Sequence, residues 1–386
     1  MLNNMTVTRS NVTSGVGRAH RRRRSLKVAF AVVVALLLLG LAALLWVFER
    51  DSAAPVEPAA SAPTAAPTEE PPLTSQAPAA IAAEMSRRAF PGGAPNVLLV
   101  KDTASADALA ASGLQGRLSA PLLLTAGDVL PPETAAELQR LGRPEVHILG
   151  GAAAISLEIE QQLLAAGFSL HRHAGETGPA TAVDVATRHF PSSDTAALVS
   201  LGAIGGAPVD AFAESLPTSS LAAAEQLPVL LTAPDQLSPA TTDYLASSAI
   251  ARVQVIGDPT RISDAVLEAV RALGVEAVRV AAADRFSNAL AVAQARGFAD
   301  ASTTSVVVLA QGETGSAWPA SFIGSINTGR FGGAPMVLVD GETLPEPTRT
   351  FLSAGEPAST FLLCTPGVPE GTCAEARTLV SGAAGS

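Results

Sequence analysis

Short apolar runs alternate with amphipathic segments throughout the chain beyond residue 79. The runs at 96–100 and 121–124 are almost continuously apolar, as in strands buried on both faces. Residues 155–166 instead carry apolar side chains at helical spacing, with Ser156 as the expected N-cap. A short helix is expected at 107–113 and a last strand at 168–172. Uniformly apolar strands joined through helices are typical of parallel sheets covered on both faces, so we predict an α/β fold.

One apolar phrase returns three times at equal intervals. It is PLLLT from Pro121, PVLLT from Pro228 and PMVLV from Pro335, so each copy begins 107 residues after the previous one. A second phrase keeps the same register, as VHILGG, VQVIGD and TFLLCT. A period of this length matches a small domain. We predict three tandem modules at residues 79–178, 179–286 and 287–386, the third lacking its last short strand.

An uncharged segment of 21 residues, at 28–48, precedes the modules. As a helix it would be about 31 Å long, close to the thickness of a bilayer's hydrocarbon core. A run of arginines stands before it and acidic residues follow, so the positive-inside rule places residues 1–27 in the cytoplasm and the modules outside. A cleaved signal peptide is the alternative, although its apolar region would normally be only about 7–15 residues long. We expect a retained single-pass membrane anchor.

Composition changes sharply on either side of this segment. Residues 49–78 are mostly Ala, Pro, Ser, Thr and Glu, which bury too little apolar surface to offset their ordering entropy, so we expect an extended, disordered spacer. Residues 1–27 hold seven Lys or Arg and no acid, whereas the remainder holds 18 basic and 35 acidic residues. That balance of −17 disfavours nucleic acid as a partner.

Several phrases of the first module occur together in one known family. They are DALA at 107–110, PLLLT at 121–125, HILGG at 147–151, Ile155-Ser156, and Ala174-Gly175 followed by Thr181-Ala182. In these phrases residues 79–386 resemble the cell wall binding repeat 2 family. The resemblance implies three Rossmann- or flavodoxin-like modules in a pseudo-threefold arrangement, which bind an anionic cell-wall polymer or a peptidoglycan-linked glycopolymer non-covalently. The third copy is degenerate, since the sequence AWPA replaces DALA at 317–320.

An anionic polymer would be held where strands end and helices begin. Helix N-termini gather at the carboxyl edge of a parallel sheet, where their free N–H groups attract anions, and arginines supply forked contacts. The resemblance adds the Asp of DALA and the leucine run. The candidate polymer-binding residues are Asp107, Leu122, Leu123, Leu124, Gly150, Gly151, Arg172, Asp210, Gly257, Arg261, Arg279 and Arg285. The plainer alternative is structural: glycines that let the chain bend, arginines paired with local acids, and leucines that fill the core.

Signals of catalysis are weak. His171 and His173 alternate onto one strand face, as a metal pair would, but their counterparts one period on are Val278 and Val280. We therefore expect core positions and no metal site. No Ser or Cys stands in a recognisable nucleophile context, and the glycines after residue 201 do not match a dinucleotide fingerprint. We predict no enzyme activity and no cofactor.

Two cysteines, Cys364 and Cys373, would lie in an oxidising compartment if the modules are extracytoplasmic. We expect a disulfide between them that compensates for the degenerate third module. The sequence as a whole predicts a membrane-anchored protein facing the cell wall, which binds glycopolymer through three repeats. The alternative is a degenerate repeat scaffold that docks another envelope protein without binding polymer.

Overall fold

The computed structural model describes residues 77–200, 202, 208–312, 322–323, 333–354, 360–365 and 367–382, with the backbone alone at 208–214. All of them belong to one compact unit, Ala66–Ser386. The predicted tail, anchor and nearly all of the predicted spacer lie outside the described residues. Within the described part, no helix combines the length and the apolar character that a membrane crossing needs.

The first module contains a four-stranded parallel sheet with strand order β2-β1-β3-β4. The central strand β1 pairs Leu98 with Leu122 on one side and with His147 on the other. Helices connect successive strands, as a parallel sheet requires. The elements are α2 (Pro78–Ala89), β1 (Asn96–Lys101), α3 (Ser105–Leu118), β2 (Leu122–Thr125), α4 (Pro132–Arg140), β3 (Glu145–Leu149), α5 (Leu157–Ala165) and β4 (Leu170–His173).

The second module repeats this topology with strand order β6-β5-β7-β8. Its first helix, α6, packs on β6, as α2 packs on β2 in the first module. The elements are α6 (Gly178–His189), β5 (Thr195–Ser200), α7 (Pro208–Glu225), β6 (Val229–Thr232), α8 (Pro239–Ser247), β7 (Arg252–Ile256), α9 (Asp264–Ala272) and β8 (Glu276–Val280).

The third module has a parallel sheet of order β10-β9-β11, three strands among the residues that the structure describes. The elements are α10 (Arg285–Ala295), the 3-10 turn η1 (Ala301–Thr303), β9 (Val306–Gln311), β10 (Met336–Val339), α12 (Glu346–Ser353), β11 (Phe361–Cys364) and α13 (Glu370–Val380). No counterpart of β4 or β8 follows α13 among these described residues. The fold is therefore α/β with three parallel-sheet modules, as the apolar pattern predicted.

Two predicted element boundaries in the first module were wrong. The predicted strand at 168–172 starts later, because Gly167 has a positive φ of 84° and the Phe168 N–H bonds back to the carbonyl of Leu163. These bonds close the preceding helix and delay the strand. The predicted helix at 107–113 is twice as long in the structure and covers Ser105–Leu118, because its small residues pack against a second helix.

One buried hydrogen bond recurs at the repeat period. The hydroxyl of Thr134 donates to the carbonyl of Leu124 at 2.6 Å. The Thr241 hydroxyl donates to Leu231 at 2.7 Å, and that of Thr348 to Leu338 at 2.6 Å. Each threonine is fully buried, so the bond ties the helix after the edge strand to the carbonyl of that strand's second-to-last residue in every module. The three modules share a local structure as well as a topology.

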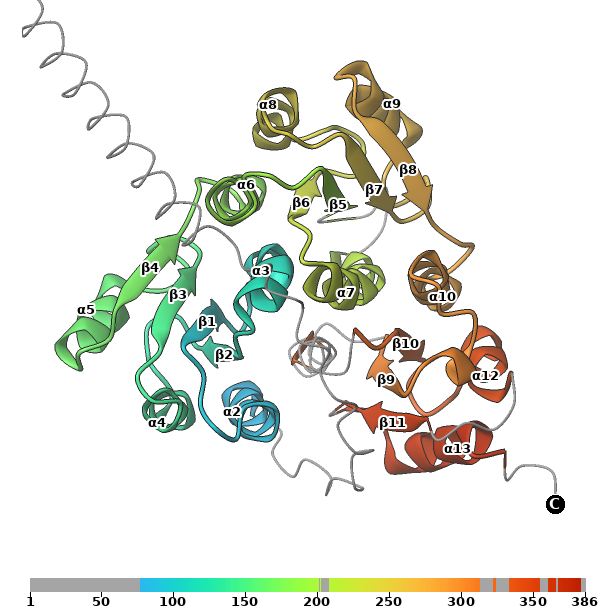
Figure 1. Cartoon of the computed structure of the whole chain (residues 1–386), viewed down its shortest axis with the longest axis horizontal. Coiled ribbons are helices and arrows are strands. Elements are labelled where there is room, and N and C mark those ends of the chain that lie inside the picture. The colour runs from blue at the N-terminus through green and yellow to red at the C-terminus, as the bar shows by residue number, and fades with distance from the viewer. Residues whose placement is uncertain are drawn as a thin grey trace, which may run out of the picture. The chain divides into compact units, whose positions relative to one another are not determined.

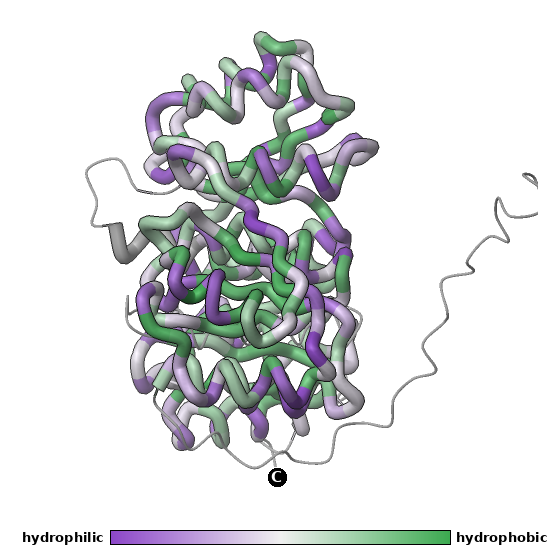
Figure 2. Tube along the Cα trace, turned by 90° about the vertical axis from the view of Figure 1, so that its left-hand side faces the viewer, coloured by the Kyte–Doolittle hydropathy of each residue, from purple (hydrophilic) through white to green (hydrophobic). Residues whose placement is uncertain are grey.

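The modules pack through helices at very short range. Figure 1 shows α3 and α7 side by side, and a Cβ built at Gly116 would stand only 1.7 Å from the carbonyl oxygen of Ala223. A Cβ built at Gly113 would likewise stand 1.8 Å from the carbonyl oxygen of Leu227. One hydrophobic cluster then runs through all three sheets, with Leu98 as one of its members. Figure 2 shows that hydrophobic positions gather in the strands, while helices alternate between hydrophilic and hydrophobic turns.

Candidate functional site

The carboxyl edge of the first sheet has the strand order at which open α/β sheets bind ligands. The connection from β1 leads through α3 to β2, whereas β3 leads through α5 to β4 on the opposite side. Open α/β sheets bind ligands where the strand order reverses in this way. The reversal lies between the ends of β1 and β3, at Lys101 and Leu149. We call this edge the first mouth and define it by Lys101, Asp107, Gly127, Gly150 and Gly151.

The first mouth includes a helix N-terminus without a side-chain cap. The N-cap position of α3 is Ala104, which makes no capping hydrogen bond, so the side chain there satisfies none of the first-turn N–H groups. Lys101 ends the central strand beside this turn, and its aliphatic carbons lie 3.0–3.1 Å from where a Cβ at Gly127 would stand. The arrangement presents one cationic side chain and one positive helix end at the same edge.

Asp107 lies in the first turn of α3 and faces the glycine turn after β3. A Cβ built at Gly150 would stand 2.5 Å from its Oδ2, and Gly150 has a φ of 101°, which only glycine adopts easily. Burial raises the pKa of the Asp107 carboxyl. The structure therefore brings Asp107 and Gly150 together, and it leaves open space around Gly151.

The N-terminus of α5, by contrast, is already occupied. The Ser156 hydroxyl accepts the N–H of Ile159 at 3.4 Å. The pKa of Glu158 is lowered by hydrogen bonds from its own backbone N–H and from Ser156. A carboxylate thus already uses the N–H groups of this helix end. Asp107 also lies in the first turn of α3, but it makes no hydrogen bond to that turn's N–H groups among the described residues, so we look for the anion-binding potential of the mouth at α3.

The predicted arginines are engaged in local contacts. Arg172 donates to Glu160 at 2.6 and 2.9 Å and to the carbonyl of Gly150 at 2.8 Å. One period on, Arg279 donates to Asp264 at 2.8 Å and to the carbonyl of Gly257 at 2.7 Å. Their guanidinium groups hold the glycine turn in place, which is the structural role that the sequence left open.

The remaining predicted residues lie elsewhere. Leu122, Leu123 and Leu124 are fully buried in β2 and belong to the core. Gly257 has a φ of 120° and stands against Arg261 at the second glycine turn. Arg285 opens α10, stacks on Phe286 and lies 3.5 Å from Asp340 of the third module. Asp210 falls in α7, where only the backbone is described.

Lys101 was missed by the sequence reasoning. It is one of two lysines in the chain and ends the central strand, where the other modules place Ser200 and Gln311. An alignment of the last residue of the first strand in each module would have shown a basic residue in the first module only.

A cluster of histidines lies on the other side of the first module. Nδ1 of His147 is 3.1 Å from Nε2 of His173; the ring of His171 stacks on His147, and the ring of His189 meets both edge-on. Burial lowers the pKa of His147 to about 3 and that of His173 to about 4, with like charge on neighbouring histidines as a smaller cause. Both rings are therefore neutral at pH 7. The prediction of core positions holds for His173, which is buried, and is wrong for His171, whose side chain is half exposed.

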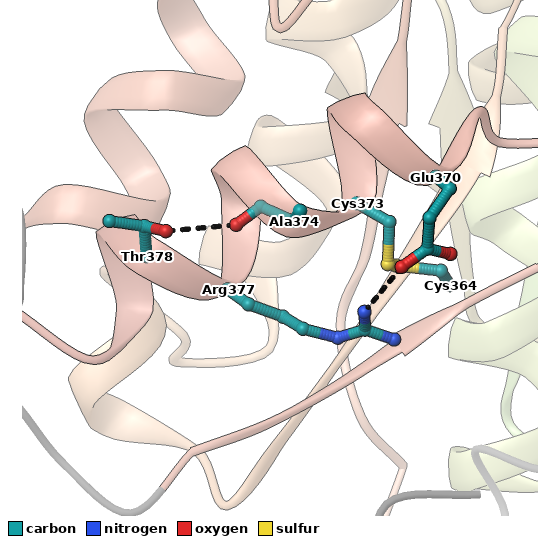
Figure 3. The surroundings of a disulfide bond; sticks show 6 residues. All are labelled: Cys364, Glu370, Cys373, Ala374, Arg377 and Thr378. Carbon is teal, nitrogen blue, oxygen red and sulfur yellow. Dashed lines mark hydrogen bonds and ion pairs between the residues drawn. A yellow bond between two sulfur atoms is a disulfide. The ribbon is translucent and has the colours of Figure 1, made fainter. Parts of the chain in front are cut away.

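A disulfide joins Cys364 and Cys373 in the third module (Figure 3). It links the end of β11 to the first turns of α13, with a Cα–Cα distance of 6.2 Å. Arg377 donates to Glu370 at 3.1 Å along the same helix. The bond therefore closes the glycine- and proline-rich turn between the strand and the helix.

Comparison with known proteins shows which family and which solved structures share this architecture. The family model for Cell wall binding domain 2 (CWB2) matches residues 76–160 and 172–267, in the first two modules. The chain is 26% identical over 261 residues to N-acetylmuramoyl-L-alanine amidase LytC of Bacillus subtilis, covering 68% of this chain and 48% of that protein. It is 31% identical over 173 residues to the Amidase enhancer of the same organism, covering 45% of this chain and 22% of that protein.

Solved structures show the same fold. Cwp8 from Clostridium difficile matches with a TM-score of 0.68 at 21% identity, over 79% of this chain and 51% of that one. Cwp6 from the same organism matches with a TM-score of 0.66 at 23% identity, over 78% and 46%. The chain thus spans about half or less of the length of these relatives, and the shared part is the repeat region.

Proposed function

Because its first two modules belong to the Cell wall binding domain 2 family, we propose that this chain holds to the cell wall by binding an anionic glycopolymer non-covalently. The family match carries the cell-wall assignment. The polymer, its binding residues and the attachment of the chain to the membrane are our inferences. The role is one of binding, without catalysis.

The first mouth is the part of the described chain best suited to an anion. An uncapped helix end, a lysine and an open glycine turn meet at the strand-order reversal. Charge-assisted hydrogen bonds from Lys101 and the α3 N–H groups would hold a phosphate or carboxylate of the polymer. Asp107 would add specificity, since its carboxylate oxygens can accept hydrogen bonds from hydroxyl groups of the polymer.

The family match also supports an extracytoplasmic location, and we propose that residues 28–48 anchor the chain in the membrane with residues 1–27 in the cytoplasm. The spacer at 49–78 would then carry the modules towards the wall. The support is the uncharged stretch and its flanking charges. Alkaline carbonate washing of membranes tests it: an anchored chain stays in the pellet, whereas a chain cleaved after the apolar segment is released.

Sedimentation with purified cell walls tests polymer binding. The full chain should pellet with untreated walls and stay in solution once the anionic polymers are chemically stripped. Pelleting that ignores the stripping would favour the alternative of a scaffold that docks another envelope component, which the similarity to an amidase enhancer supports. No pelleting with either wall preparation would remove polymer binding and leave the scaffold alternative, because purified walls need not carry its protein partner.

A pair of matched variants tests the mouth itself. Lys101→Gln installs the residue of the third module, and we expect roughly tenfold weaker wall binding, because a hydrogen bond to a charged group is worth about 1.5 kcal/mol. Arg252→Gln removes the same charge at the opposite edge of the second sheet, where β7 begins, and should leave binding unchanged. Equal losses for both would indicate general electrostatics in place of a site.

A further inference from the structure

We propose that His147, His173 and His189 form a binding site for a single zinc ion or a similar transition-metal ion. One ring nitrogen from each residue lies within 4.8 Å of the others. In tetrahedral zinc sites with Zn–N bonds of about 2.0–2.1 Å, ligand nitrogens are about 3.3 Å apart. The 3.1 Å between Nδ1 of His147 and Nε2 of His173 is already close to that spacing.

The second nitrogen of each inner ring faces an oxygen that can orient it. Nε2 of His147 lies 3.2 Å from Oδ1 of Asn96. Nδ1 of His173 lies 3.5 Å from Oδ2 of Asp184, at ion-pair distance, although neither atom makes a hydrogen bond among the described residues. Metal-bound histidines almost always donate their other ring N–H to a carboxylate or carbonyl in this way. The two contacts leave Nδ1 of His147 and Nε2 of His173 pointing at each other, with a metal ion able to replace the proton that they share.

His189 supplies the third nitrogen and an independent indication. Its Nε2 is buried and has no hydrogen-bond partner among the described residues. A buried polar atom without a hydrogen-bond partner costs folding free energy, so a core position that binds no ligand would not be expected to keep such a nitrogen. Coordination would satisfy this atom, and the partial exposure of the His189 ring leaves the ion a route from solvent.

The site is specific to the first module. One period on, the three positions hold Gln254, Val280 and Arg296, which cannot form a histidine site. The expectation of no metal site rested on Val278 and Val280, which stand one repeat period after His171 and His173. The structure adds two histidines, from β3 and from α6, that sequence spacing did not place beside His173.

Binding would tie two modules together. His147 and His173 lie on β3 and β4 of the first sheet, whereas His189 lies near the end of α6, which also packs on β6 of the second sheet. A metal ion would therefore clamp the first sheet to the helix that opens the second module. Arg188, which pairs with Asp184 at 2.8 Å, adds a positive charge nearby and would weaken affinity without blocking the site.

Cobalt titration of the full chain tests this proposal. The chain, in mild detergent and freed of metal with a chelator, should bind one Co²⁺ with the visible absorption of a tetrahedral site, and Zn²⁺ should displace it. His147→Gln, His173→Val and His189→Gln should each lose the absorption, the first two being the residues of the second module. His171→Ala, a half-exposed histidine beside the cluster, should keep it.

The wild-type titration alone can overturn the proposal, whether or not every variant folds. A chain that takes up no Co²⁺ or Zn²⁺ at micromolar concentration leaves the cluster as a packed stack of neutral rings. Cobalt absorption that survives all three substitutions, or that disappears with His171→Ala alone, also contradicts it. Melting temperature supplies a second measurement, since Zn²⁺ should raise it in the wild type and leave it unchanged in His189→Gln.

Discussion

The first and third modules share a core and differ at its edge. Both pair their first strand with the strand of the recurring phrase, and both carry the same threonine bond to that strand. At the glycine turn they diverge. The first module has Gly150 there, held by Arg172 from a fourth strand. The third has Cys364 at the equivalent position, joined to Cys373, and no fourth strand among its described residues. The two repeats therefore differ in sequence at the sheet edge, while their shared core is kept.

The contrast extends to how modules are joined. The first docks on the second through backbone contact at Gly113 and Gly116. The third docks through a buried arginine, Arg296, whose Nε lies 3.8 Å from Glu225 of the second module. Burial lowers the pKa of Arg296 and the Glu225 charge partly restores it. Small residues therefore set the first junction, whereas the second combines a charge pair with a close approach of Gly333 to Ala224.

Gly116→Val should have the largest effect, because a Cβ there would overlap the Ala223 carbonyl and push α3 away from α7. Overpacking typically costs about 1–3 kcal/mol, and we expect the upper end here because the clash is with backbone. Chemical denaturation should show the loss, and limited proteolysis should release the first module before the third. Gly92→Val is the matched control, since nothing lies within 4 Å of its Cβ position. Equal loss in both variants would mean that helix contact does not limit stability.

Replacing both Cys364 and Cys373 with alanine should destabilise the third module specifically. Closing a loop of about ten residues is worth roughly 2.7 kcal/mol on the chain-entropy model. Hydrogen exchange should therefore quicken in β11 and α13 while the first sheet keeps its protection. Uniform loss of protection across all three sheets would instead show that the modules unfold as one.

Thr134→Val and Thr348→Val test whether the buried threonine bond stabilises the first and third modules equally. Each removes a buried donor and leaves a strand carbonyl unsatisfied, which costs about 1–3 kcal/mol. The two losses should agree within about 0.5 kcal/mol, since both threonines are fully buried with the same partner geometry. Thr350→Val, on the exposed side of α12, controls for helix propensity. A much smaller loss at Thr348 would indicate a looser third core.

The core could be predicted from the sequence because apolar residues recur at the repeat period. The PLLLT phrase is a fully buried strand, and the predicted parallel α/β class follows from it. The edge was harder to predict. Arg172 could be placed near Gly150, but its pairing with Glu160 depends on how α5 lies against β4. His189 joins His173 only because α6 returns along the sheet, a contact that no local pattern encodes.

Asp107→Asn should give the smallest effect and a pH signature. Burial raises the pKa of Asp107 above its ordinary 3.8, so the ionised carboxylate destabilises the folded state. Below pH 3.8 both folded and unfolded chains carry the proton and the residue contributes nothing. As the pH rises through the folded pKa the penalty develops fully. Asp107→Asn should therefore raise the unfolding free energy at pH 7 and leave it unchanged at pH 3.

Urea denaturation at the two pH values measures this difference. Asp128→Asn removes an exposed carboxylate near the same mouth and should show no such gain. If the Asp107→Asn variant is more stable at both pH values, the gain comes from packing and not from charge. A gain confined to neutral pH would mean that the first mouth retains a destabilising acid that the third module, with Ala317 in the corresponding phrase, has lost. Retention at a stability cost is what a binding residue, and not a core residue, would show.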